Sequence, residues 1–122
     1  MSDQSPHATR EPVRDPQDLE RLLVSREIAG DIEGMVALYE PHAVIDSGGG
    51  QLVRGQEAIR KFFAEVVATG RKFQFGSQQV PIIAGDLALT STRVPDGTVT
   101  AEVARKQRDG TWLWVIDRFS II

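Results

Sequence analysis

Residues 29–39 read Ala29-Gly-Asp-Ile-Glu-Gly-Met-Val-Ala-Leu-Tyr39, and residues 54–63 read Arg54-Gly-Gln-Glu-Ala-Ile-Arg-Lys-Phe-Phe63. In both segments a glycine precedes apolar residues spaced three and four apart, which is typical of an amphipathic helix. A short apolar strand at residues 43–46 and the bend Ser47-Gly-Gly-Gly50 lie between them. The order of helix, strand, bend and helix therefore predicts a mixed α and β architecture.

The N-terminal half of the chain predicts three helices. The first is expected to begin at Asp15, whose side chain can cap free backbone N–H groups. The second begins at Asp31 and carries its apolar stripe to Tyr39. The third covers residues 55–69 and ends at Gly70, because glycine readily adopts the backbone conformation that terminates a helix.

After Gly70 the apolar period changes from about 3.6 to two, which indicates strands. We expect four long strands, at residues 73–83, 86–94, 98–108 and 111–121. Two turns support this division, Pro95-Asp-Gly97 and the hairpin turn Asp109-Gly110. Three helices followed by an antiparallel meander give the fold class α+β.

Composition excludes several kinds of function. The chain has 122 residues, which is the size of one domain, and 41% of them are hydrophobic. It contains no cysteine, so disulfides, thiolate catalysis and cysteine-bound metals are excluded. A net charge of −3 with dispersed basic residues gives no support for nucleic-acid binding. His7 and His42 are isolated in the sequence, and we expect neither a metal nor another cofactor.

The ends of the domain follow from the same patterns. Residues 1–14 are polar and contain proline, and we expect a disordered N-terminal tail followed by one domain over residues 15–122. No apolar run approaches the length of a membrane helix, and the N-terminus lacks the apolar core of a signal peptide. The sequence therefore predicts a cytoplasmic protein without a membrane partner.

Alternation along the last two strands singles out one carboxylate and one guanidinium. Asp117 alternates with apolar residues, and a carboxylate on an apolar face must be paired, solvated by a cavity or protonated. Arg105 shares the apolar face of the preceding strand with Val103, whereas the opposite face, with Thr100 and Glu102, is expected to be solvated. Counting from the hairpin turn places Arg105 near Asp117. The pair is either a structural ion pair or a polar group at the floor of a ligand pocket.

The opposite face of the sheet is also apolar, and this predicts a partner. On strict alternation the outward side chains are Leu87, Leu89, Trp112, Trp114 and Ile116. Such a patch is large for a monomer. We therefore expect a homodimer that associates through the outer face of the sheet.

Four segments carry a resemblance to a known family. They are 29–39, 53–63, Gly85-Asp-Leu-Ala-Leu89 and Arg105-Lys-Gln-Arg-Asp-Gly-Thr-Trp-Leu-Trp-Val-Ile-Asp117. In this order they resemble the SnoaL-like group of the NTF2-like superfamily, and more narrowly its DUF4440 branch with the SgcJ/EcaC-type proteins. The resemblance implies a cone-shaped fold, with three helices packed on a curved, mostly antiparallel sheet around an internal pocket.

The same fold is distantly similar to ketosteroid isomerase, but the catalytic residues of that enzyme do not carry over. Its general-base aspartate falls on Ser47, with Asp46 one residue earlier. Its oxyanion-hole tyrosine falls on Leu23, and its protonated aspartate falls near Val103. An isomerase of this kind requires a base and donors aimed at an enolate, so we rank isomerisation below other functions.

The resulting hypothesis is a protein that binds or transforms a small, largely apolar molecule. Asp117 and Arg105 are its predicted catalytic or ligand-orienting pair. The alternative is a non-catalytic binding or association module in which that pair is structural. Tyr39 either faces the pocket or completes the core. The residues expected to contact the ligand are Tyr39, Asp46, Phe62, Phe63, Thr90, Thr92, Val103 and Phe119.

Overall fold

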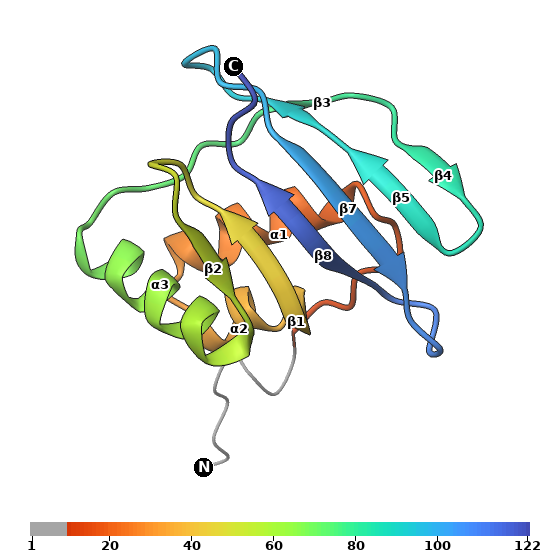
Figure 1. The fold of residues 1–122 in the computed structure, drawn as a ribbon, viewed down its shortest axis with the longest axis horizontal. Coiled ribbons are helices and arrows are strands. Elements are labelled where there is room, and N and C mark those ends of the chain that lie inside the picture. The colour runs from red at the N-terminus through yellow and green to blue at the C-terminus, as the bar shows by residue number, and fades with distance from the viewer. Residues whose placement is uncertain (1–9) are drawn as a thin grey trace.

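The structure, a computed structural model, describes residues 10–122 (Figure 1). Its helices are α1 (Asp18–Ile28), α2 (Ile32–Val36) and α3 (Gln56–Ala68). Its strands are β1 (Tyr39–Asp46), β2 (Leu52–Arg54), β3 (Ser77–Gln78), β4 (Ile82–Ala84), β5 (Leu87–Thr90), β6 (Thr92–Arg93), β7 (Ala101–Lys106) and β8 (Trp112–Arg118). Among these residues, no helix is both long and apolar enough to cross a membrane.

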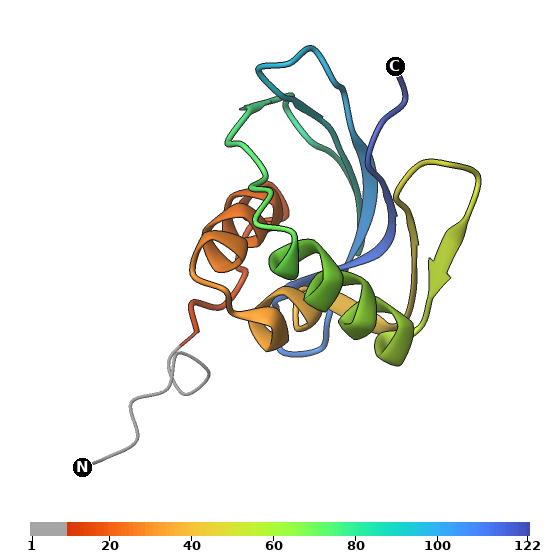
Figure 2. The same ribbon diagram turned by 90° about the vertical axis from the view of Figure 1, so that its left-hand side faces the viewer.

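One curved sheet carries the helices on a single face (Figures 1 and 2). Six strands form it in the order β2-β1-β8-β7-β5-β4, and a second, small sheet pairs β3 with β6. The pairing of β1 with β8 is parallel and all other pairings are antiparallel. The predicted α+β class, with three helices on a mostly antiparallel sheet, is confirmed.

The helix starts follow from local backbone chemistry. Asp31 caps α2, because its carboxylate accepts the N–H of Gly34 at 3.0 Å. Gly55 precedes α3 with a φ of 85°, a conformation that only glycine adopts without strain. The helix α1 begins at Asp18 rather than at Asp15, which instead accepts the backbone N–H of Gln17 in the preceding turn.

Two predicted elements have different limits in the structure. The second helix ends at Val36, and Tyr39 already belongs to β1. The predicted strand 73–83 is wrong as a single unit, since β3 and β4 belong to different sheets. Pro81 lies in the gap between them and has no backbone N–H to donate to a strand partner.

An extra residue in β8 corrects the predicted strand faces. Val103 and Ala104 on β7 pair with Ile116 and Trp114, so β8 has one more residue than its partner at Val115. Such a bulge reverses the alternation on one strand. Trp114 and Asp117 consequently both face the helices, although strict alternation had placed them on opposite faces.

The correction extends to the neighbouring strand. Glu102 and Ala104 of β7 are buried under the helices, and the side chain of Arg105 is exposed. The predictions that Glu102 faces solvent and that Arg105 faces the interior are therefore wrong. Trp112 and Trp114, predicted as part of an outer patch, are 5% and 0% exposed and belong to the core. Leu87, Leu89 and Ile116 do lie exposed, on the alternate positions that face away from the helices.

The core lies between the sheet and the helices. Its largest fully buried side chains include Trp114, Phe63 and Leu19, which come from β8, α3 and α1. Tyr39 connects the first two, with ring centroids 5.1 Å from Trp114 and 5.7 Å from Phe63. The interior therefore depends on contacts between segments that are far apart in sequence.

The N-terminal segment 10–14 is fixed to the domain, which corrects part of the predicted tail. Arg10 donates to both carboxylate oxygens of Asp31 at 2.7 and 2.8 Å, and Val13 is buried. The carbonyl of Val13 also accepts the N–H of Trp112. The remainder of the predicted tail, residues 1–9, lies outside the described residues.

The assignment of Trp114 to the core predicts a large loss of stability on truncation. Trp114→Ala should lower the free energy of unfolding by about 3–5 kcal/mol, the usual cost of emptying a buried tryptophan site. Val80→Ala, at a site 88% exposed, should change it by less than about 0.5 kcal/mol. Urea denaturation followed by far-UV circular dichroism measures both, and equal effects would contradict the strand faces described.

Candidate functional site

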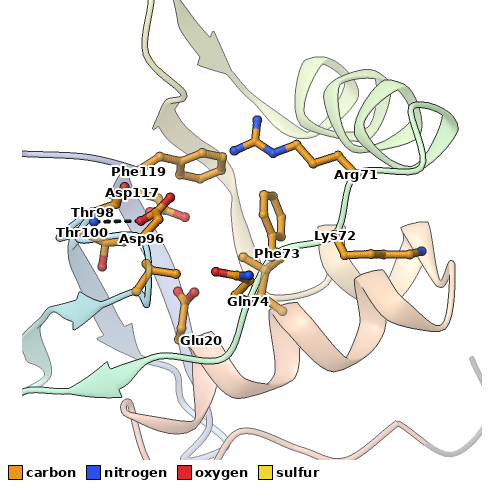
Figure 3. Close-up of a pocket in the computed structure, with 12 residues that line it drawn as sticks. Glu20, Arg71, Lys72, Phe73, Gln74, Asp96, Thr98, Thr100, Asp117 and Phe119 are labelled. Carbon is orange, nitrogen blue, oxygen red and sulfur yellow. Dashed lines mark hydrogen bonds between the residues drawn. The ribbon is translucent and has the colours of Figure 1, made fainter.

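A pocket of about 340 Å³ opens between α1, the segment after α3, the turn before β7 and the end of β8 (Figure 3). Its lining consists of Glu20, Leu23, Arg71, Lys72, Phe73, Gln74, Val94, Asp96, Thr98, Thr100, Asp117 and Phe119. The pocket lies on the helix side of the sheet. Its walls mix aromatic rings with hydroxyl and carboxyl groups.

Asp117 lies at the buried end of the pocket and is 2% exposed. The hydroxyl of Tyr39 donates to its Oδ2 at 2.5 Å, a short hydrogen bond. Burial, and then the charges of Glu102 and Glu20, raise the pKa of Asp117 well above its usual range. Burial and the Asp117 charge likewise raise the pKa of Tyr39. Asp117 is therefore placed to hold a proton at neutral pH.

Glu102 is the direct neighbour of Asp117 across the β7–β8 pairing, and both side chains are buried. The hydroxyl of Thr90 donates to Glu102 Oε1 at 2.7 Å. Glu102 Oε2 is buried without a hydrogen-bond partner among the described residues. Burial raises the pKa of Glu102, although hydrogen bonds from Thr100 and Thr90 oppose the rise. Two adjacent buried carboxyls favour a state in which at least one is protonated.

Glu20 adds a third carboxyl group from the helix side. It projects from α1 into the pocket and is partly buried (Figure 3). Burial, followed by the charge of Glu102, raises the pKa of Glu20 to about 8. This carboxyl therefore changes protonation close to neutral pH, as a general acid or base must.

Aromatic and aliphatic side chains form the apolar part of the wall. The rings of Phe73 and Phe119 meet edge to face with centroids 5.8 Å apart, and Phe62 packs behind Phe119 at 5.8 Å. The backbone N–H of Phe73 donates to Glu27 Oε1 at 2.9 Å, which attaches this segment to α1. Leu23 completes the wall. The apolar surface is therefore held by both the helix and the sheet.

Charged side chains at the rim are exposed. Arg71 extends its guanidinium toward the Phe119 side of the opening, whereas Lys72 points away from the pocket (Figure 3). Asp96 lies on the strand side, where its carboxylate accepts the N–H of Thr98 at 2.8 Å. This bond lowers the pKa of Asp96. The rim is ionic, while the interior holds carboxyl groups that favour the neutral state.

The predicted pair of Asp117 with Arg105 is wrong. Arg105 lies on the outer face of the sheet and forms an ion pair with Glu40, with Nε and Oε2 3.0 Å apart. The β7–β8 register places Arg105 opposite Leu113 rather than near Asp117. In addition, the β8 bulge turns Asp117 inward while Arg105 stays outward. The hydrogen-bond partner that Asp117 has instead, Tyr39, comes from the start of β1.

Asp46 and Val103, both predicted to contact the ligand, lie away from this pocket. Asp46 pairs with Arg118 at 3.0 Å, and both line a separate outer-face depression of about 440 Å³. Val103 lines the same depression. The position that the resemblance had matched to a protonated aspartate is thus one residue away from the inward-facing Glu102.

The other residues predicted to contact the ligand differ in whether they line the pocket. Phe119 lines the pocket, and Phe62 supports it. Phe63 is fully buried in the core. Thr90 and Thr92 are buried, but they do not line the pocket. Thr90 instead donates a hydrogen bond to Glu102.

Glu20 and Glu102 are site residues that the sequence patterns did not predict. Glu20 follows Leu19 and precedes Leu22 and Leu23, so it lies at the edge of the apolar stripe of α1 and resembles an ordinary surface residue. Glu102 had been placed on a solvated face with Thr100. The signal that could have found it is Thr90-x-Thr92 on the facing strand, because hydroxyl groups there can satisfy an inward carboxyl.

The chain was compared with known proteins. The family model of the SnoaL-like domain matches residues 20–121. The chain belongs to the SnoaL-like family. Membership of the narrower DUF4440 branch remains a prediction. A search of curated proteins found no match.

Solved structures with the same fold come from several bacteria. A Novosphingobium aromaticivorans NTF2-like protein with a cystatin-like fold is 19% identical, with a TM-score of 0.69 over 97% of this chain and 89% of that one. A function-unknown Mycobacterium tuberculosis protein is 18% identical, with a TM-score of 0.68 over 84% of this chain and 66% of that one. A proposed dehydratase of the NTF2-like family from Streptomyces avermitilis is 17% identical, with a TM-score of 0.66 over 82% and 88%. These likenesses show the NTF2-like fold of this SnoaL-like chain.

The pocket of this SnoaL-like chain contains groups that can exchange protons and rings that can contact a ligand. Within residues 10–122, no group of three or more His, Asp or Glu side chains is arranged to hold a metal ion. The carboxyls of Glu20 and Asp117 can each donate or accept a proton at the surface of the cavity. Phe73 and Phe119 offer apolar contact to the body of a ligand.

The raised pKa of Glu20 predicts how stability depends on pH. The unfolded chain loses this proton near the ordinary pKa of 4.5, whereas the folded protein holds it up to about pH 8. The contribution of Glu20 to stability is therefore complete below pH 4.5 and is lost as the pH rises through 8. Glu20→Gln removes the titration, so its stability relative to the wild type should rise by at least about 1 kcal/mol between pH 5 and pH 9.

Urea unfolding at pH 5, 7 and 9 measures this difference. Glu57→Gln is the matched control, because the Glu57 side chain is 91% exposed on α3. A Glu20→Gln difference that is constant with pH would show that Glu20 is not perturbed in the folded protein.

Proposed function

We propose that this SnoaL-like protein binds a small, largely apolar molecule in the α1–β8 pocket and performs acid–base chemistry on it without a cofactor. The observation that supports this proposal is the position of Asp117. It is a buried carboxyl at the inner end of a cavity, fixed by Tyr39 and flanked by Glu102. We place the protein in the cytoplasm on the sequence argument given above.

The chemistry follows from the two protonation states of the pocket carboxyls. A protonated Asp117 donates a hydrogen bond to a ligand oxygen and stabilises negative charge that develops there. Glu20, with a pKa near 8, accepts or returns a proton from the helix side of the same cavity. Isomerisation, dehydration and cyclisation all use such a pair, and one fold neighbour is itself a proposed dehydratase.

A second candidate is a binding module without catalysis. The Tyr39–Asp117 hydrogen bond favours it, because both groups are fully buried and the bond joins β1 to β8 within the core. On this alternative, Asp117 is a structural group and the pocket only holds the ligand. The two candidates differ in whether a proton moves to or from the bound molecule.

A carbonyl probe with exchangeable α-protons separates them. We expect 2-acetylnaphthalene to bind the wild type, and its methyl protons to exchange for deuterium in D₂O faster than in buffer alone. Asp117→Asn should keep an amide donor for the carbonyl and so retain binding. It should lose about 100-fold of the exchange rate, because general acid–base groups contribute about 10²–10⁴-fold. Isothermal titration calorimetry and proton NMR provide the measurements.

Arg105→Gln is the control, because Arg105 lies on the outer face, and it should change neither binding nor exchange. Tight binding without exchange would select the non-catalytic candidate. Absence of binding by the wild type would refute the proposed ligand pocket.

We also propose that the protein is a homodimer formed through the outer face of the sheet. Leu87 and Leu89 on β5 and Ile116 on β8 are 40%, 47% and 51% exposed on that face, and these two strands flank β7. A monomer rarely leaves such an apolar surface open. The buried Trp112 and Trp114 take no part in this interface, in contrast to the interpretation from sequence.

The dimer has a direct test by substitution. Ile116→Glu places a charge on the outer face and should shift the protein to a monomer in sedimentation velocity at micromolar concentration. Ile28→Glu is the matched control, since Ile28 is equally exposed, at 51%, but ends α1 on the helix side. A wild type that sediments as a monomer would rule the interface out.

A further inference from the structure

Within the described part of the chain, the carboxyl groups of Glu20, Glu102 and Asp117 have no cationic partner. Glu20 and Asp117 line the cavity, and Glu102 lies beside Asp117 on the neighbouring strand. None of the three forms an ion pair with any residue from Arg10 to Ile122. Buried acids in proteins are normally paired with a cation or bound to a metal. A cation supplied from outside could therefore bind beside these carboxyls, since no described side chain of the domain provides one.

A second observation concerns Glu102, which lies beside Asp117 on the neighbouring strand and does not itself line the cavity. Glu102 is 2% exposed, and its Oε2 accepts no hydrogen bond within the described residues. Its other oxygen accepts from Thr90. An unpaired buried carboxyl oxygen is costly, and a positive charge bound next to Asp117 would reduce that cost.

The basic side chains at the rim do not neutralise this interior. Arg71 and Lys72 are both exposed, and Lys72 points away from the opening (Figure 3). Arg71 extends across the mouth on the Phe119 side, whereas Glu20 projects from α1 below it. Positive charge is thus present outside the pocket and absent from the described residues within it.

We propose that the ligand of this pocket carries a protonated amine, bound at the carboxyl end of the cavity, on an apolar body that lies against Phe73 and Phe119. This inference rests on the proposed function and names the chemical class of its ligand. An ammonium group offers three N–H donors, which match carboxylate oxygens of Glu20 and Asp117. Aromatic rings beside an ammonium add a favourable cation–π contact. Because no described cluster is arranged to hold a metal, the expected cation is organic.

Binding of the amine is linked to proton release. The empty pocket favours neutral carboxyls, and a cation reverses that preference, so protons must leave as the amine enters. The titratable or charged groups that face the cavity or its carboxyls are Glu20 on α1, Tyr39 on β1, Glu102 on β7, Asp117 on β8, and Arg71 and Asp96 at the rim. Affinity for the amine therefore rises with pH until the amine itself deprotonates.

Three probes of nearly equal shape test the proposal on the wild-type protein. They are 2-naphthylmethylamine, the neutral 2-naphthylmethanol and the anionic 2-naphthoate. At pH 8 we expect the amine to bind at least 10-fold more tightly than the alcohol, and the naphthoate to bind least. At pH 5.5, where the carboxyls hold their protons, the preference for the amine should fall below about 3-fold. Calorimetry in phosphate and in Tris counts the protons released.

Two variants assign the effect to the pocket. Glu20→Gln and Asp117→Asn should each reduce the preference for amine over alcohol while leaving alcohol binding within about 3-fold. Glu57→Gln is the matched acid-to-amide control on exposed α3 and should retain the full preference. If either variant folds poorly, the comparison of the three probes on the wild-type protein still tests the proposal.

The outcomes separate this inference from the proposed function. Equal binding of amine and alcohol, or tighter binding of naphthoate, overturns the amine and leaves an apolar ligand pocket in place. Failure of all three probes to bind overturns both. A preference for the amine that is unchanged from pH 5.5 to pH 8, or unchanged in both pocket variants, places the cation elsewhere and also overturns the inference.

Discussion

The extra residue in β8 determines what the interior of this domain contains. Val115 has no separate partner on β7, so the strand presents Trp114 to the helices and, three residues later, presents Asp117 to the same side. A bulge is the usual way in which a sheet redirects a side chain next to a functional site. Here it joins an aromatic core to an acidic pocket within one strand, and Tyr39 links the two by stacking on Trp114 while donating to Asp117.

The acidic interior lowers the stability of the folded domain. Neutral carboxyls are tolerated inside the domain, but their ionisation in a buried place is unfavourable, and the raised pKa values of Glu20, Glu102 and Asp117 express that cost. Partial compensation comes from hydroxyl groups: Thr90 for Glu102 and Tyr39 for Asp117. A fold selected only for stability would place apolar residues here. The retention of several acids beside a cavity is typical of functional sites, where perturbed pKa values cluster.

Much of the fold could be predicted from the sequence, because helix stripes and turn residues are local signals. The cap at Asp31, the helix over residues 56–68 and the hairpin at Asp109-Gly110 all follow from neighbouring residues. The site depends on register, which is not local. One added residue at Val115 moved Arg105 and Asp117 to opposite faces and placed Asp117 on the same face as Glu102, and strict alternation contains no signal for such an insertion. Phe119 was correctly predicted to line the pocket. It follows Asp117 by two residues, and both lie after the bulge, so alternation still places them on one face.

The segment between α3 and β3 sets limits on how the pocket can be redesigned. A side chain at Gly76 would meet the carbonyl of Arg93 at 2.6 Å, so this position must remain glycine while the loop packs on β6. Phe73 is likewise fixed through its backbone by Glu27. Arg71 and Gln74, in contrast, are exposed side chains at the opening. A library that varies these two positions samples new ligand preferences on an unchanged backbone, and the mouth can diversify independently of the acids beneath it.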